Sequence, residues 1–165
     1  EVFQAWGLEV HQGDSLFEKH GYFGGTDDQR LADLQNFIDN PSIKAIFCAR
    51  GGYGMTRILD NLDLSSLDAS PKWIIGFSDI TALHLALAKK GLCSVHGLMP
   101  VQFGYYDAER SIEGLRQLLF EGKGIIDAPG SNFNRFGKCR APMVGGNLSL
   151  VADSLGTASE ISSDR

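Results

Sequence analysis

The stretch Gly76-Phe77-Ser78-Asp79-Ile80-Thr81 follows an apolar run, Trp73-Ile74-Ile75, and leads into a segment in which apolar residues recur with helical spacing. This order predicts a strand, a tight turn that carries Ser78, and a helix, which together form a nucleophile elbow. The start of the helix would offer unpaired backbone N–H groups beside the hydroxyl, and such groups stabilise an oxyanion. Serine is also a common helix N-cap, and the stretch lacks the full Gly-x-Ser-x-Gly signature, so both interpretations of Ser78 are open.

A second turn of the same kind lies upstream. The short apolar run 46–50 ends at Arg50 and enters Gly51-Gly52-Tyr53-Gly54, after which apolar residues again have helical spacing. Consecutive glycines allow positive φ and a close approach of the backbone to a ligand. The third glycine of a dinucleotide loop and the Gly-Lys-Ser/Thr of a P-loop are both missing. The pattern therefore favours a glycine turn whose N–H groups bind an anionic substrate or an oxyanion.

Strands and helices alternate along the chain. We expect strands at 45–48, 73–75 and 93–95, and helices at 31–37, 55–62, 80–89 and 109–120. Such alternation predicts an α/β fold with a mainly parallel sheet and helices on both faces. Ligands of these sheets bind at the carboxyl ends of the strands, where both glycine turns would lie. Residues 122–140 are rich in Gly, Pro, Ser and Asn and predict irregular chain, with edge strands as an alternative.

The global composition excludes several classes of protein. With 165 residues, 15 basic and 20 acidic side chains give a net charge of −5, which argues against a nucleic-acid-binding surface. No apolar run approaches the roughly 20 residues of a membrane span. The cysteines at 48, 93 and 139 are widely spaced and match no metal-ligand pattern, so we expect reduced thiols in a cytoplasmic setting, with no metal and no cofactor.

Three further polar residues are candidates for a site. Arg50 ends a buried strand before a glycine turn, where its guanidinium could bind a substrate carboxylate or pair with Asp79. Asp79 could orient the elbow or favour the helix dipole. Asn147 follows two glycines and precedes an apolar run, so it could cap a helix or line a site between domains.

The four histidines differ in their surroundings. His96 follows a strand-like stretch at the same edge as the elbow, which makes it the internal candidate for a general base, although a histidine in such a place is more often structural. His84 lies on the apolar side of the helix after Ser78, and we expect it to be packed there. His11 and His20 lie in polar, turn-like surroundings, and we expect them to be solvated.

Taken together, the motifs resemble the successive motifs of the LD-carboxypeptidase family, which includes the microcin C self-immunity proteins. The resemblance covers nearly the whole chain in the family's order and approximate spacing. It rests on YFGGTDDQR (22–30), FCARGGYG (47–54), PKWIIGFSDITALH (71–84), VHG (95–97) and VGGNLS (144–149).

The resemblance implies a serine peptidase that acts on an L,D peptide bond and releases the terminal D-alanine of murein tetrapeptides in cell-wall recycling. It implies that Ser78 is the nucleophile and that the oxyanion donors are the N–H of Asp79 and that of Gly51 or Gly52. It also implies a Rossmann-like three-layer domain similar to class I glutamine amidotransferases, often homodimeric, with a peptide as partner and neither nucleic acid nor membrane. A microcin C-type immunity peptidase and a non-catalytic peptide-binding domain are the alternatives.

The chain departs from the family pattern at both ends. The resemblance places the triad glutamate and histidine in segments beyond the Gly-Gly-Asn-Leu motif, and no matching segments occur before Arg165. The first strand of the family also has no counterpart. We therefore expect a fragment of a longer protein that is inactive by itself. Its nucleophile-bearing domain would span 1–121, and 122–165 would be a linker and the start of a C-terminal domain.

Overall fold

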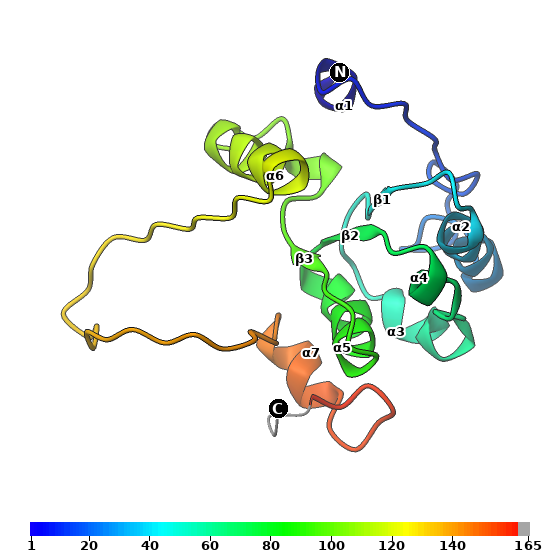
Figure 1. Cartoon of the computed structure of the whole chain (residues 1–165). Coiled ribbons are helices and arrows are strands. Elements are labelled where there is room, and N and C mark those ends of the chain that lie inside the picture. Colours follow the sequence, from blue (N-terminus) through cyan, green and yellow to red (C-terminus); the bar gives the residue numbers. More distant parts are fainter. Residues whose placement is uncertain (162–165) are drawn as a thin grey trace.

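A three-stranded parallel sheet forms the centre of the computed structural model, which describes residues 1–161 (Figure 1). Its strands are β1 (Ala45–Phe47), β2 (Trp73–Gly76) and β3 (Val95–His96), in the order β1-β2-β3. Ile46 lies opposite Ile74, and Gly76 lies opposite His96. The expected α/β fold with a parallel sheet is confirmed, and the third strand begins two residues later than expected.

Helices cover both faces of this sheet. Ile46 and Ile74 point to one face, where they join a buried core with residues of α2 (Asp27–Asp39), α3 (Met55–Ile58) and α5 (Thr81–Lys89). The alternate strand residue Phe47 points to the other face and contacts Phe3 of α1 (Val2–Ala5), with 4.4 Å between ring centroids. On that face, α6 (Glu109–Glu121) contributes the buried Leu115. The two-residue period of the strands therefore divides the core into two layers.

Capping and breaking residues explain both ends of α2 and the C-terminal end of α6. Thr26 and Gln29 form a reciprocal capping box at the start of α2, since Thr26 Oγ1 accepts from Gln29 N–H and Gln29 Oε1 accepts from Thr26 N–H. At the other end, Pro41 follows the C-cap residue Asn40 and cannot continue the helix. Helix α6 ends at Gly122, whose φ of 66° is the left-handed conformation that favours glycine.

The shorter elements were only partly expected. The helix expected at 55–62 is divided into α3 and a 3-10 helix, Leu59–Asn61. Three elements were not expected: α1, α4 (Ser66–Ala69) and a 3-10 helix at Pro100–Gln102. Such one-turn helices carry too few residues for a periodic pattern.

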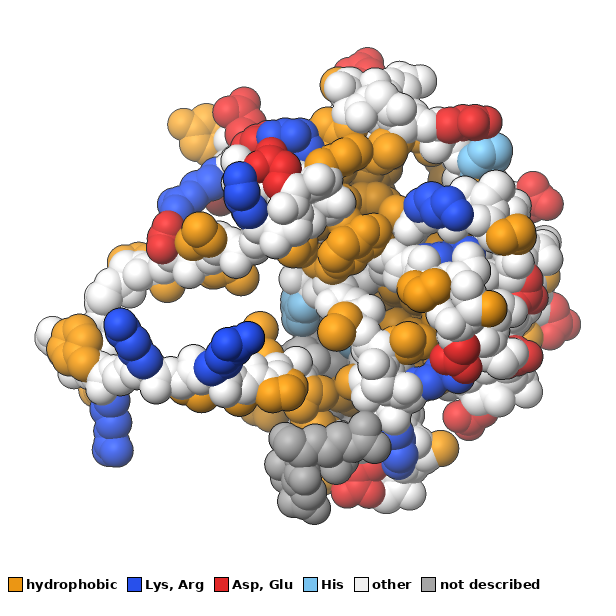
Figure 2. Space-filling view, in the orientation of Figure 1, with side chains coloured by type: hydrophobic (Ala, Val, Ile, Leu, Met, Phe, Trp, Pro, Cys, Tyr) orange, Lys and Arg blue, Asp and Glu red, His pale blue; other side chains and the backbone are white. Residues whose placement is uncertain are grey.

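Residues 122–144 leave the body of the protein and return to it. Figure 1 shows this segment running outward from α6 and back to α7 (Leu148–Asp153), which lies against α5. It contains no strand, so the alternative of edge strands is not realised in residues 122–140. Figure 2 shows hydrophobic and basic side chains along it, and Ile126, Phe133, Phe136 and Met143 are almost fully exposed.

Candidate active site

Ser78 stands on a strained turn between β2 and α5. After Gly76 the backbone is extended at Phe77, and Ser78 then adopts a φ of 60° at the start of a 3-10 helix, Ser78–Ile80. It is the only residue other than glycine with positive φ in the part of the chain that the structure describes. This conformation costs free energy for a residue other than glycine, and backbone strain of this kind is concentrated at functional sites. The strand, strained turn and helix have the geometry of a nucleophile elbow.

The alternative interpretation of Ser78 as a helix N-cap is wrong. The residue preceding the 3-10 helix is Phe77, the residue preceding α5 is Ile80, and neither helix start has a side-chain cap. Ser78 is itself the first residue of the 3-10 helix, and its backbone has left-handed dihedral angles. The extended backbone that a capping side chain requires is thus absent at this position.

A close contact between Gly76 and Ile80 explains how the turn is so tight. A β-carbon at Gly76 would lie 2.9 Å from Ile80 Cγ1, so a larger residue has no room there. The carbonyl oxygen of Gly76 accepts two hydrogen bonds, from the N–H of Gly97 and from the ring of His84. These contacts fix the end of β2 directly before the turn.

The glycine turn 51–54 lies beside Ser78, as two parallel neighbouring strands require. A β-carbon at Gly51 would lie 3.1 Å from Ser78 Cβ and 3.4 Å from Ser78 Oγ. Gly52 has a φ of 155°, which side chains rarely adopt. Within residues 1–161, neither the N–H of Gly51 nor that of Gly52 donates a hydrogen bond to another group of the chain. Both N–H groups are therefore available to a ligand next to the serine.

The carboxylate of Asp79 joins the two turns. Its Oδ2 accepts the N–H groups of Gly54 and Met55, each at 2.9 Å, and the residue is buried. The expected alternative of an Arg50–Asp79 pair is therefore wrong, because the free N–H groups at the start of α3 take that place. Arg50 is exposed and its Nε donates to the carbonyl of Gly51 at 3.2 Å. The other interpretation of Arg50, a carboxylate-binding residue, stays a prediction.

Two histidines contact the residues just before Ser78. His84 is buried as expected, with Nε2 2.9 Å from the Gly76 oxygen and Nδ1 2.8 Å from Ser94 Oγ. A carbonyl only accepts, so Nε2 carries the proton and Nδ1 accepts from the hydroxyl. Burial, the larger cause, and His96 lower the pKa of His84, whereas the hydrogen bond to Gly76 raises it. His84 is therefore a neutral packing residue.

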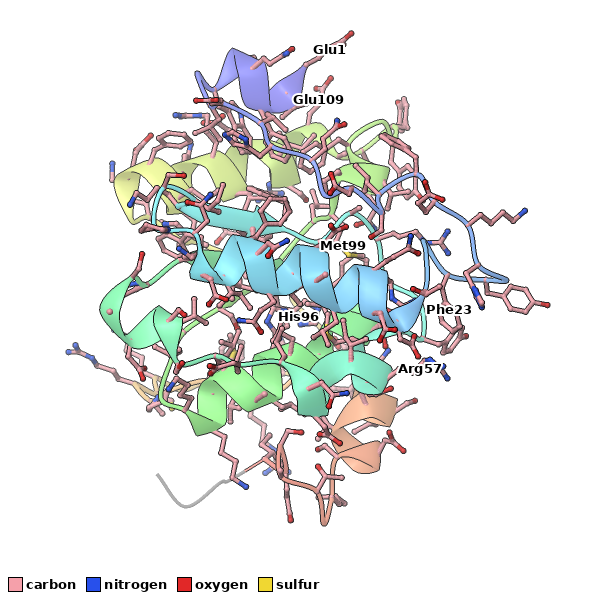
Figure 3. All side chains as sticks on the ribbon, turned by 90° about the vertical axis from the view of Figure 1, so that its right-hand side faces the viewer. Glu1, Phe23, Arg57, His96, Met99 and Glu109 are labelled. Atoms are coloured by element: carbon pink, nitrogen blue, oxygen red, sulfur yellow. The ribbon has the colours of Figure 1, made fainter. Side chains whose placement is uncertain are left out.

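His96 lies at the carboxyl edge of the sheet, where the sequence placed it, and it is exposed. Its ring stacks on Phe77 and on His84, with centroid distances of 5.9 and 6.0 Å. Figure 3 shows His96 near the centre of the molecule. Within residues 1–161 no hydrogen bond joins its ring to Ser78. A role as base stays a prediction.

Asn147 caps α7 and also attaches it to the elbow helix. Its side-chain oxygen accepts from the N–H groups of Ser149 and Leu150, which is one of the two roles expected. Its backbone N–H donates to Oγ1 of Thr81, a wholly buried residue at the start of α5, at 2.9 Å. After the segment 122–144, the chain thus contacts the elbow helix at Thr81, three residues beyond Ser78.

The thiol of Cys48 lies near Asp79, although part of the residue remains accessible. Burial, and then the negative charge of Asp79, raise the pKa of this thiol to about 12. Cys48 is consequently protonated at neutral pH and a poor nucleophile. All three cysteines are free, as expected.

Sequence reasoning overlooked Arg30, which lies against the far side of the glycine turn. Its guanidinium is within 3.1–3.2 Å of where a Gly54 β-carbon would be, although the two residues are 24 positions apart. Figure 3 shows Phe23 and Arg57 close together at the N-terminal end of α2, where a hollow of about 360 Å³ opens. In the sequence, Arg30 stood out only as part of the motif 22–30. No local pattern could reveal its contact with Gly54.

Within the described residues, no group of three acidic, histidine or cysteine side chains is placed to hold a metal ion. In the same part of the chain, no helix combines the length and apolar character that crossing a bilayer requires.

Comparison with known proteins finds a matching family model and similar relatives. Residues 1–97 match the model of the LD-carboxypeptidase N-terminal domain. A probable murein peptide carboxypeptidase of Bacillus subtilis is 38% identical over 160 residues, 94% of this chain and 50% of the relative. The murein tetrapeptide carboxypeptidase of Pseudomonas aeruginosa is 35% identical over 92% of this chain and 52% of its own. The chain thus spans about half the length of the curated relatives that it matches.

Solved structures of similar proteins are also known. The muramoyltetrapeptide carboxypeptidase of Oxalobacter formigenes is 30% identical with a TM-score of 0.63, over 72% of this chain and 41% of that one. The microcin C7 self-immunity protein superposes with a TM-score of 0.77 over 98% of this chain and 57% of that one. At 22% identity, this second likeness shows a common fold only.

Proposed function

Because this chain belongs to the LD-carboxypeptidase family, we propose that it is the nucleophile-bearing half of a serine peptidase that releases the terminal D-alanine from murein tetrapeptides. The observation that carries this proposal is the strained φ of 60° at Ser78, on a turn that Gly51 touches. The names of the relatives from Bacillus subtilis and Pseudomonas aeruginosa support the substrate class.

The proposed reaction proceeds through an acyl-enzyme. Ser78 Oγ forms a bond to the carbonyl carbon of the terminal peptide while its proton passes to a base, and the developing oxyanion accepts hydrogen bonds. The donors would be the N–H of Asp79 and that of Gly51 or Gly52. The C–N bond then breaks, D-alanine leaves with a proton on its amine, and water hydrolyses the ester to free Ser78.

The base of this reaction would come from the glutamate and histidine that the family resemblance places after the Gly145-Gly146-Asn147 motif. His96 is the alternative within residues 1–161. Arg50 is exposed three residues beyond the end of β1, and we propose that it binds the terminal carboxylate.

We also propose the division into domains that the sequence predicted, with 1–121 bearing the nucleophile and 122–165 leading into a C-terminal domain. The half-length coverage of the relatives supports a second domain. The three strands would then be part of a larger three-layer sheet, like that of class I glutamine amidotransferases.

The test is D-alanine release from a murein tetrapeptide by the protein in its natural full length, followed by chromatography. We expect release by the wild type, and a loss of at least about a thousandfold in Ser78→Ala, since other enzymes lose this much without their nucleophile. Ser111→Ala, an exposed hydroxyl on α6, is the matched control and should retain full activity. Undiminished release by Ser78→Ala would remove Ser78 from the mechanism.

A second candidate is an immunity-type peptidase. The microcin C7 self-immunity protein of Escherichia coli is 34% identical over 98 residues, 59% of this chain. Aspartyl sulfamoyl adenosine, a ligand named for a structure of that protein, is a suitable probe. Cleavage of this compound without cleavage of the tetrapeptide would favour this candidate, and tetrapeptide binding without cleavage would favour a non-catalytic domain.

A further inference from the structure

The glycine turn 51–54 makes few bonds of its own, yet its N–H groups must be placed accurately if they bind an oxyanion. Productive donors lie 2.7–3.1 Å from the oxyanion, so small displacements are costly. Glycines restrict the backbone less than any other residue. The position of the turn must therefore be imposed by neighbouring side chains, and the structure contains two of them.

Asp79 holds the turn from the side of Ser78. Its Oδ2 accepts two N–H groups at the downstream end of the turn, those of Gly54 and Met55. These are the only hydrogen bonds of its carboxylate within residues 1–161. A buried carboxylate needs such donors, because it has lost its water. Asp79 directly follows Ser78, so the bonds link the elbow to the downstream end of the turn.

Arg30 supports the turn from the opposite side. Its side chain is only 16% exposed, stacks over the ring of Phe23 at 4.6 Å and bonds to Asp27. The guanidinium lies so close to Gly54 that a β-carbon there would be 3.1 Å from Cζ. Ring, carboxylate and guanidinium together form a rigid support that Gly54 cannot move into.

We propose that Asp79 and Arg30 are positioning residues that clamp Gly54 between them and so hold the Gly51 and Gly52 N–H groups in register with Ser78. The inference rests on the proposed function, since it assigns the clamp to the oxyanion-binding turn of that same site. Neither side chain reaches the substrate in this proposal. Each acts through the backbone of the turn.

The first experiment measures kcat and KM for the tetrapeptide in the full-length Asp79→Ala variant. We expect kcat to fall about tenfold to a hundredfold with KM nearly unchanged, because a displaced oxyanion donor affects the transition state alone. Asp79→Asn keeps an oxygen in place and should recover most of kcat.

Asp33 provides a matched control, because its carboxylate also accepts two backbone N–H groups, those of Asp14 and Ser15, away from Ser78. Asp33→Ala should leave kcat within about twofold of wild type if the effect of Asp79 is specific to the site. An equal loss of kcat in Asp33→Ala and Asp79→Ala would overturn the proposal.

The second experiment compares two arginines of similar chemistry. Arg57, like Arg30, bonds to Asp27 and lies over Phe23, at 5.4 Å, but it is half exposed and is not among the atoms nearest Gly54. We expect Arg30→Met to lower kcat by about tenfold and Arg57→Met to lower it by less than about threefold. Equal effects of the two variants would overturn the role of Arg30.

A third measurement does not depend on activity. Amide hydrogen exchange followed by NMR should show Gly54 and Met55 protected in the wild type and exchanging at least about tenfold faster in Asp79→Ala. If these amides respond but the wild type cleaves no peptide, the proposed function fails and the clamp stands. If the wild type cleaves and neither kcat nor exchange changes in Asp79→Ala, the clamp fails and the proposed function stands.

Discussion

Gly51 lies against Ser78 so closely that a β-carbon at position 51 would be 3.4 Å from the serine Oγ and 3.1 Å from its Cβ. The contact joins the ends of two neighbouring parallel strands that are separated by more than twenty residues in sequence. It places the backbone N–H groups of one turn beside the hydroxyl of the other. The candidate site is therefore a property of the pair of turns.

A methyl group at position 51 should disturb the serine more than the fold. We expect Gly51→Ala to lower kcat for the tetrapeptide by about tenfold or more through displacement of Ser78, and to lower the free energy of unfolding by about 1 kcal/mol. Enzyme assays and urea denaturation would measure the two effects. Gly104→Ala, where no atom lies within 4 Å of the new methyl, is the control and should change neither quantity.

The strain at Ser78 should be measurable as stability. Glycine adopts a φ of 60° without the cost that a β-carbon brings, so we expect Ser78→Gly to be about 1 kcal/mol more stable than Ser78→Ala. Both variants lack the hydroxyl, so the comparison isolates the backbone. Urea denaturation of the two proteins tests this, and equal stabilities would show that the turn relaxes once the hydroxyl is removed.

The attachment of α7 to the elbow helix should depend on Gly146. A β-carbon there would lie 2.5 Å from Thr81 Oγ1, whereas one at Gly145, with a similar φ of 150°, would meet nothing. We expect Gly146→Ala to cost about 1–3 kcal/mol more in unfolding free energy than Gly145→Ala, since only the former forces overpacking. If the two costs are equal, the Thr81 contact is not what holds this segment.

His84 should make stability depend on pH. Its pKa in the folded protein is lowered from the ordinary 6.5, so below about pH 6.5 the unfolded chain binds a proton that the folded chain does not. The free energy of unfolding should then fall with falling pH, by at most about 1.4 kcal/mol per pH unit from this group. The contribution of His84 to the free energy of unfolding should be retained well above pH 6.5.

The measurement is urea denaturation between pH 7.5 and 5.5. His84→Gln, which keeps a donor near the Gly76 oxygen, should show a smaller loss over this range than the wild type. A slope as steep in His84→Gln as in the wild type would assign the pH dependence to other groups.

The sequence by itself determined the strands, the two glycine turns and the motifs that identify the family. Apolar runs bounded by glycines, such as the one before Ser78, are local patterns, and local backbone preferences decide them. The parallel pairing follows from the alternation of these runs with helices. The buried position of His84 was also predictable, because helical spacing put it on the apolar side.

Only the tertiary structure decided how the side chains of the site are paired. The sequence left Ser78 between an elbow and a cap, and the left-handed backbone that selects the elbow depends on the packing of Gly76 against Ile80. Asp79 was expected to pair with Arg50, to orient the elbow or to favour the dipole of its own helix, and no local pattern indicated that it bonds to the start of α3. Arg30 meets Gly54 across 24 residues. Such contacts depend on how distant elements pack, and that distance in sequence leaves no periodic or compositional trace.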